Sequence, residues 1–194
     1  CYEHTIPVTP RGAGTGLCGG CVPIHGGVVL NLAEMDRLLE VDPINMTATV
    51  EAGLLLMEFA KLLEGSGFFY PPDPGEKSAT VCGNIMTNAG VMRAVRYGVT
   101  RDYVLGMEIV LPDGTVQELG GKSVKTSSGY NLMQLLSGSE GTLCVLTKAT
   151  VKLVPEPQVN LSLLVPFDNL EKCVEVVPDV LSCGCEPTAV EFME

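Results

Sequence analysis

The chain has no tryptophan, and aromatic residues make up only 5% of its 194 residues. Positive charge is also scarce: 12 Lys and Arg stand against 23 Asp and Glu, so the formal net charge is −11. Nucleic acids and anionic membranes require a basic protein face, and this charge argues against both partners. The sequence also lacks an apolar run of transmembrane length and a secretory signal pattern. We expect a cytoplasmic protein whose native start precedes Cys1, because residue 1 is not Met.

Patterns for metal binding and disulfides are weak as well. Eight cysteines in a chain of this length do not form a disulfide scaffold, and they suit a reducing compartment. Cys18-Gly-Gly-Cys21 has C-x-x-C spacing but no second C-x-x-C, so we interpret both as small packing residues. Cys183-Gly-Cys185, with Cys173 at a distance, is a weaker signal still. The sequence predicts no metal site.

The apolar pattern predicts a mixture of helices and strands, and thus an α+β fold. Hydrophobic residues make up 46% of the chain and charged residues 18%, which is typical of a globular protein with one domain or slightly more. Helical spacing covers residues 55–63, 130–136 and 169–181. Strand-like runs, one pair of them joined by a turn at Asp113-Gly114, cover residues 5–9, 28–31, 47–51, 104–111, 115–119, 143–154, 159–165 and 188–192.

A glycine-rich segment lies between the first two predicted strands. It reads Pro-Arg-Gly-Ala-Gly-Thr-Gly-Leu-Cys-Gly-Gly-Cys-Val-Pro over residues 10–23. Successive glycines can point several backbone N–H groups into one concavity, and such a concavity binds anions. A flexible linker would contain more Ser and polar residues. We therefore predict a pyrophosphate-binding loop, with the backbone amides of residues 12–16 and the Thr15 hydroxyl as donors. Arg11 either supplies charge to this loop or is an ordinary surface residue.

Part of this loop, Gly14-Thr-Gly-Leu-Cys-Gly19, also satisfies the G-x-G-x-x-G fingerprint of Rossmann folds. That fingerprint is informative only where the glycines follow a strand and open a helix. Here Pro23 and two glycines follow almost at once, and then comes the β-rich run 28–32. The gap has no room for a helix, which argues against a Rossmann fold.

The loop resembles the FAD pyrophosphate loop of the vanillyl-alcohol-oxidase-like (PCMH-type) flavoproteins, and it is closest to their glycolate oxidase and FAD-linked D-lactate dehydrogenase branch. The resemblance extends from residue 5 to residue 194. Four more segments match in order: Tyr-Pro-Pro-Asp-Pro-Gly at 70–75, Thr-Val-Cys-Gly-Asn-Ile-Met-Thr-Asn-Ala-Gly at 80–90, Arg-Tyr-Gly-Val-Thr-Arg-Asp at 96–102, and Ser-Gly-Ser-Glu-Gly-Thr-Leu at 137–143.

The resemblance implies a PCMH-type FAD-binding domain over residues 1–155, with its N-terminal lobe incomplete. After the boundary at Pro155-Glu-Pro157, residues 158–194 would open a C-terminal cap domain with a βαβ unit. The implied cofactor-binding residues come from the glycine loop, the segment along the flavin and the segment near the adenosine. They are Pro10, Arg11, Gly12, Ala13, Gly14, Thr15, Gly16, Gly20, Cys21, Pro74, Ser78, Ala79, Thr80, Gly83, Thr87, Asn88, Ala89, Gly90, Glu140, Gly141, Val145 and Leu146.

The chain departs from the family pattern at a few positions. Cys82 and Cys144 replace residues that are usually Gly, and Val91 follows Gly90 where a second Gly is common. Neither of the two histidines falls where covalently flavinylated relatives attach FAD. The resemblance therefore implies non-covalent FAD.

By resemblance, the reaction is oxidation of a 2-hydroxy acid to a 2-oxo acid, with hydride transfer to flavin N5. The family's substrate ligands, base and metal-binding histidines lie in the cap domain, so we assign no catalytic residue to this chain. A non-catalytic flavin- or nucleotide-binding module, an electron-transfer subunit, and a relative acting on another alcohol or sugar stay open. Candidate electron acceptors are an electron-transferring flavoprotein, an iron–sulfur subunit, a quinone and oxygen.

Overall fold

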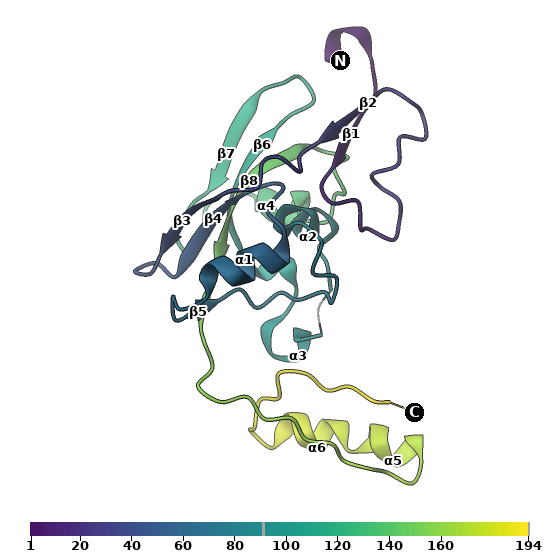
Figure 1. Ribbon diagram of the computed structural model, residues 1–194, viewed down its shortest axis with the longest axis vertical. Helices are drawn as coiled ribbons and strands as arrows, with labels where there is room; N and C mark the ends of the chain where they lie inside the picture. The colour runs from purple at the N-terminus through teal and green to yellow at the C-terminus, as the bar shows by residue number, and fades with distance from the viewer. Residues whose placement is uncertain (91, 194) are drawn as a thin grey trace.

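A five-stranded antiparallel sheet lies at the centre of the computed structural model, which describes residues 1–90 and 92–193 (Figure 1). Its strand order is β3-β4-β8-β6-β7. Every neighbouring pair is antiparallel, so the predicted α+β class is confirmed. The strands are β3 (Leu38–Asp42), β4 (Thr47–Glu51), β6 (Val104–Val110), β7 (Val116–Gly120) and β8 (Val145–Lys152).

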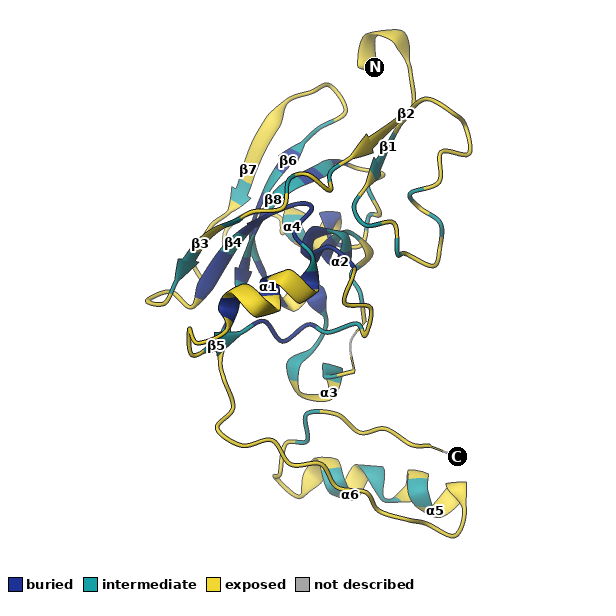
Figure 2. Ribbon diagram, in the orientation of Figure 1, coloured by how far each residue is buried: buried dark blue, intermediate teal, exposed yellow. Residues whose placement is uncertain are grey.

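Two helices cover one face of the sheet and form the core with it. In α1 (Leu56–Leu63), residues 56, 59 and 63 are buried at helical spacing, while Glu58 and Lys61 are exposed. In α2 (Val81–Thr87), Val81 and Ile85 have no exposed surface. Figure 2 shows the buried residues gathered where these helices meet the sheet. Each large apolar side chain buried here contributes about 1.5–3 kcal/mol, so this layer dominates the stability of the chain.

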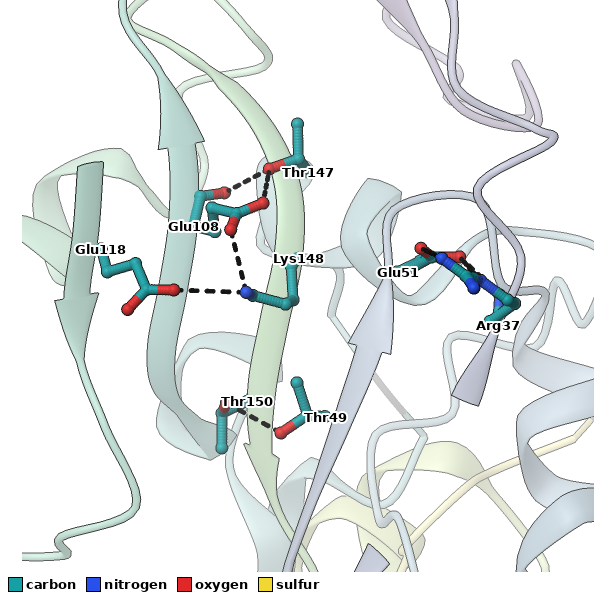
Figure 3. A network of polar contacts seen from close by, with 8 residues as sticks. All are labelled: Arg37, Thr49, Glu51, Glu108, Glu118, Thr147, Lys148 and Thr150. Atoms are coloured by element: carbon teal, nitrogen blue, oxygen red, sulfur yellow. Dashed lines mark hydrogen bonds and ion pairs between the residues drawn. The ribbon is translucent and has the colours of Figure 1, made fainter. Parts of the chain in front are cut away.

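The opposite face of the sheet is polar and is tied together by cross-strand pairs (Figure 3). Lys148 of β8 forms ion pairs with Glu108 of β6 at 2.9 Å and with Glu118 of β7 at 3.3 Å. The hydroxyls of Thr49 and Thr150 lie 3.1 Å apart across β4 and β8. Opposite charges on neighbouring strands stabilise one register, because a one-residue slip would move them to the buried face.

A separate two-stranded parallel pair holds the glycine-rich segment. Strand β1 (Val8–Arg11) pairs with β2 (Val28–Asn31), in the register Val8 to Val28 and Arg11 to Asn31. The prediction of a strand over 5–9 is therefore wrong at residues 5–7 and ends two residues too early. The reason is local: a 3₁₀ turn, η1 (Tyr2–His4), ends at Thr5 with φ 50°, a left-handed conformation that interrupts an extended chain.

Several other predictions are confirmed with shifted bounds. The hairpin around Asp113-Gly114 is present as β6 and β7, and α4 (Leu132–Leu136) lies inside the predicted helix 130–136. The predicted strand 143–154 divides into β8 and a short β9 (Val154–Pro155), which pairs with β5 (Phe68–Phe69). Two short helices connect α2 to β6, namely α3 (Ala94–Tyr97) and the 3₁₀ turn η2 (Thr100–Tyr103).

The predicted strand-helix-strand unit in the C-terminal segment is wrong in its strands. Residues 156–193 contain α5 (Leu170–Glu175) and α6 (Val177–Ser182), and the segments 159–165 and 188–192 form no strand there. The helix predicted over residues 169–181 is divided in two, and Pro178 lies in the first turn of α6, the position in a helix where proline is tolerated. The apolar runs pair with no described strand, and Leu161 and Leu163 are 85% and 89% exposed. This segment lies beside α3, to which an ion pair between Arg96 and Glu186 connects it at 3.7 Å (Figure 1).

Candidate cofactor-binding cleft

A cleft of about 500 Å³ lies where the glycine-rich segment, α2 and the segment after α4 meet. This volume is within the range of about 300–1,000 Å³ that is typical of small-molecule sites. Most of the predicted cofactor-binding residues line it. They are Pro10, Arg11, Gly12, Ala13, Gly14, Thr15, Gly16, Gly20, Cys21, Pro74, Ala79, Thr80, Gly83, Thr87, Ala89, Gly90, Glu140, Gly141 and Leu146.

The first wall is the glycine-rich loop, and at Gly12 it closely approaches the second wall, which runs from Pro74 through α2. A Cβ atom at Gly12 would lie 2.5 Å from Thr80 Oγ1, closer than real contacts allow. The same hydroxyl accepts a hydrogen bond from the Gly83 N–H at 3.0 Å and caps the start of α2. Glycine at position 12 therefore permits the loop and the capped helix to form one continuous surface.

Arg11 folds back across this loop. Gly14 has φ +76°, and a Cβ atom there would lie 2.5 Å from Arg11 Nη2, so the guanidinium group lies against the Gly14 backbone. Arg11 is exposed and forms no ion pair within residues 1–90 and 92–193. It is also the single cationic side chain among the described residues that line the cleft. This position places a positive charge beside the backbone that we expect to hold a pyrophosphate.

The third wall is the segment after α4, and two hydrogen bonds attach it to the C-terminal half of α2. The Gly138 N–H donates to the Ile85 carbonyl at 3.1 Å, and the Glu140 N–H donates to the Met86 carbonyl at 2.8 Å. Gly141 then packs on Pro10, with 3.1 Å between a Cβ built at Gly141 and Pro10 Cγ. The cleft is thus closed by residues more than a hundred positions apart in the sequence.

The cleft floor is mostly apolar, and its buried thiols stay protonated at neutral pH. Burial raises the pKa of Cys82 to about 12 and also raises the pKa of Cys144. Neutral, buried thiols are poor nucleophiles and poor metal ligands, which fits a packing role at these two positions. Among residues 1–90 and 92–193, no group of three or more His, Cys, Asp and Glu side chains is arranged to hold a metal ion.

Three predicted cofactor-binding residues lie outside the cleft lining. The Ser78 hydroxyl is exposed and donates to the Glu76 carboxylate. Asn88 ends α2 with φ 45°, and its side-chain oxygen accepts from the Arg101 N–H at 3.0 Å. Val145 points away from the cleft, because successive residues of a strand face opposite sides and its neighbours Cys144 and Leu146 line the cleft. Val91, where the family pattern has a second glycine, lies outside the described residues.

Sequence reasoning also missed several residues that line the cleft. Asn84 and Cys82 lie inside the motif at 80–90 but were not predicted to bind, although an amide on the face of α2 shared with Thr80 and Thr87 was a usable signal. Leu32 and Ala52 come from distant loops and had no sequence signal. The remaining missed residues are Leu17, Cys18, Glu76, Met86 and Cys144.

Comparison with known proteins decides the family. Over residues 1–120 the sequence matches a protein family described as FAD binding domain. The chain belongs to this family. FAD is accordingly the cofactor of this domain, and the resemblance to the FAD-dependent glycolate oxidase and D-lactate dehydrogenase branch is confirmed.

Two curated relatives align with the whole chain. A D-lactate dehydrogenase from Anaerostipes hadrus is 51% identical over 194 residues, and glycolate oxidase subunit GlcD from Bacillus subtilis (strain 168) is 45% identical over 195 residues. Both alignments cover 100% of this chain but only 41% and 42% of the relatives, so the chain spans about two-fifths of their length.

A solved structure of alkyldihydroxyacetonephosphate synthase has the same fold, with a TM-score of 0.70 at 26% identity, over 81% of this chain and 31% of that one. This confirms that the FAD-binding fold predicted from the sequence is the fold observed. Within the described residues, no helix is both long enough and apolar enough to cross a membrane.

The described residues fit FAD. The glycine loop and Arg11 suit its pyrophosphate, and the apolar floor suits a flat ring. Neither histidine lines the cleft, and non-covalent binding stays a prediction.

Proposed function

We propose that this chain is the FAD-binding part of an oxidoreductase that converts a 2-hydroxy acid of the D-lactate or glycolate type into the 2-oxo acid. The observation that carries this proposal is that all three walls of the cleft lie within the span aligned to a D-lactate dehydrogenase and a glycolate oxidase subunit. Fold alone would not support a substrate, because alkyldihydroxyacetonephosphate synthase shares it. The identities of 51% and 45% favour the hydroxy acids.

In this proposal the chain contributes binding, orientation and exclusion of water. When bound, FAD would supply the ring that accepts hydride from the substrate C–H bond. The backbone of Gly12 to Gly16, with Arg11, would hold the pyrophosphate, and the second wall would border the ring. We assign no general base to these residues, since no histidine is found in the described lining and its buried thiols have raised pKa values.

We also propose that FAD is bound non-covalently and that electrons leave to a partner protein, either an electron-transferring flavoprotein or an iron–sulfur subunit. The Bacillus subtilis relative is named a subunit of glycolate oxidase, which supports a partner subunit without indicating its cofactor. A cytoplasmic location is part of the proposal, and the eight free cysteines support a reducing compartment.

The test has two steps. First, the purified protein is denatured, and the supernatant is examined for FAD by fluorescence and chromatography. Free FAD near one per chain supports non-covalent binding, whereas flavin that stays with the denatured chain contradicts it. Second, the full-length protein is assayed with D-lactate and glycolate, using an artificial dye as acceptor. FAD without turnover of either acid would refute the proposed substrate class and would favour a module or a relative that acts on another alcohol.

A further inference from the structure

Two exposed thiols meet at the end of α6, outside the cofactor-binding cleft. The Sγ atoms of Cys183 and Cys185 lie 3.0 Å apart. Both sulfurs also approach the Val180 carbonyl oxygen, Cys183 Sγ at 3.2 Å and Cys185 Sγ at 3.6 Å. Neither cysteine lines the cleft, so cofactor binding does not explain why the two thiols converge.

The backbone at the end of α6 brings the two thiols together. Cys183 ends the helix, and its N–H donates to the Asp179 carbonyl at 3.0 Å. Gly184 follows with φ +83°, a left-handed conformation that glycine adopts without strain and that often ends a helix. A Cβ atom at Gly184 would meet nothing within 4 Å, and both cysteines are exposed. The turn therefore presents the sulfurs where a small molecule in solution can reach them.

The two sulfurs are close to the geometry of a disulfide. A disulfide bond is about 2.05 Å long, so the sulfurs need to approach each other by only about 1 Å, a movement that side-chain rotation can supply. In the described part of the chain, no group of three or more His, Cys, Asp and Glu side chains is arranged to hold a metal ion, so the pair does not belong to a metal site of that kind. Disulfide formation is the chemistry that this pair favours.

The contact between the sulfurs also divides the roles of the two thiols. The Cys183 sulfur accepts a hydrogen bond from the Cys185 S–H, which lowers the pKa of Cys183 and raises the pKa of Cys185. The thiolate is the nucleophile in thiol–disulfide exchange. Cys183 is therefore the expected attacking thiol, and Cys185 is the thiol that completes the bond.

A disulfide at this turn would be readily reduced again. It would close a loop across a single intervening residue, and the stabilisation that a disulfide provides falls as the closed loop shortens. Exposed disulfides are also the labile ones, and in reducing compartments disulfides are usually transient and redox-sensing. We therefore expect the pair to follow the thiol–disulfide balance of its surroundings.

We propose that Cys183 and Cys185 form a reversible redox site that exchanges with small-molecule disulfides. The Cys183 thiolate attacks one sulfur of the small disulfide, forms a mixed disulfide and releases a first small thiolate, which takes up the proton that Cys183 has lost. Cys185 then loses its proton and attacks the Cys183 sulfur, which releases the second small thiol. The two cysteines give up two electrons and two protons, and the small disulfide gains both. The proposal depends neither on FAD nor on the hydroxy acid.

Mass spectrometry of the full-length protein tests this site directly. The protein is exposed to 2-hydroxyethyl disulfide, which is uncharged and is not repelled by a chain of net charge −11, and the remaining free thiols are then alkylated. Cleavage after Glu175 and Glu191 gives a fragment in which Cys183 and Cys185 are the two cysteines. We expect this fragment to be two hydrogens lighter and to carry no alkyl label, and we expect dithiothreitol to restore both labels.

Two variants separate the roles of the thiols. Cys185→Ser should leave Cys183 as a mixed disulfide with 2-mercaptoethanol, at a level at least about tenfold above that of the wild type, because no neighbouring thiol displaces the small thiol. Cys173→Ser is the matched control, since it keeps the pair, and it should oxidise as the wild type does. A wild-type fragment that stays fully alkylated, or that carries two mixed disulfides, overturns the proposal, and so does a bond from either cysteine to Cys173. FAD content and turnover do not enter this measurement, so failure to oxidise D-lactate or glycolate would refute the proposed function alone.

Discussion

Replacing Gly12 with alanine tests how closely the glycine loop and α2 are fitted together. The new Cβ would lie 2.5 Å from Thr80 Oγ1 and 3.5 Å from its Cγ2, so one of the two segments must shift. Forcing an extra methyl group into a packed contact costs about 1–3 kcal/mol. For a chain of this size, that corresponds to a melting temperature lower by about 2–12 °C. We also expect weaker FAD binding, because the shift displaces the N–H groups of the loop.

The double mutant with Thr80→Ala shows whether this contact is the cause. Thr80→Ala alone removes the cap of α2 and should destabilise the chain by about 0.5–2 kcal/mol. It also removes the oxygen that Gly12→Ala would meet, so Gly12→Ala should cost at least about 0.5 kcal/mol less in that background, a coupling of the size seen for residues in contact.

Urea denaturation followed by far-UV circular dichroism suits the measurement, because the chain has no tryptophan for fluorescence. Gly16→Ala is the matched control, since a Cβ there meets nothing within 4 Å, and its effect on stability should stay within about 0.5 kcal/mol. Additive losses in Gly12→Ala and Thr80→Ala would refute the proposed contact. An equal loss in Gly16→Ala would show that the loop penalises any alanine, whatever its neighbours.

Three further predictions concern charge and thiol chemistry. Arg11→Gln should weaken FAD binding by about tenfold at low salt and by less at high salt. Because the side chain is exposed, the stability should change by no more than about 0.5 kcal/mol. Calorimetry at two salt concentrations with a parallel melting curve checks both effects, and a loss of FAD affinity that does not depend on salt would contradict the prediction. Glu51 accepts from the Arg37 guanidinium at 2.7 Å, which holds the pKa of the Glu51 carboxyl below its usual range. The stability from this pair is present above the unfolded-state pKa of Glu51 and is lost as pH falls through its folded-state pKa. Glu51→Gln should therefore lower the melting temperature at pH 7 and have less effect near pH 3. An equal drop in melting temperature at both pH values would exclude the ion pair as the source of the effect. Alkylation at pH 8, followed by mass spectrometry, should modify the exposed Cys18 and leave Cys82 unmodified in the folded chain, since burial raises the pKa of Cys82 to about 12. Bound FAD should slow the alkylation of Cys18, because this residue lines the cleft.

The features predicted best from the sequence are those that local chemistry determines. The loop at 10–23 was recognisable because its glycines and prolines specify backbone conformation directly, and Asp113-Gly114 specifies a hairpin in the same way. The missed strand β3 illustrates the opposite case. Its register shifts between Leu38 and Glu40, so the alternation of apolar and polar residues that signals a strand is broken there.

The parts of the cleft that were missed depend on tertiary contacts. Leu32 and Ala52 reach the cleft only because β2 and β4 end beside it. The runs 159–165 and 188–192 have strand composition, but a strand also needs a partner for its backbone hydrogen bonds, and no described strand pairs with them. Asn88 has a polar amide of the kind that can bind a ligand, yet its side-chain oxygen accepts a hydrogen bond from the Arg101 N–H instead.

The position of β8 has a consequence for the order in which the chain can fold. β8 lies between β4 and β6, although it is the last of the five sheet strands in the sequence. The β3–β4 and β6–β7 hairpins are therefore made first during synthesis and stay unjoined until residues 145–152 arrive. Pairings across such long separations close slowly, which leaves two half-sheets with open edges in the meantime. A chain that stops at residue 120, where the family match ends, would never join them, and its third cleft wall would be missing as well.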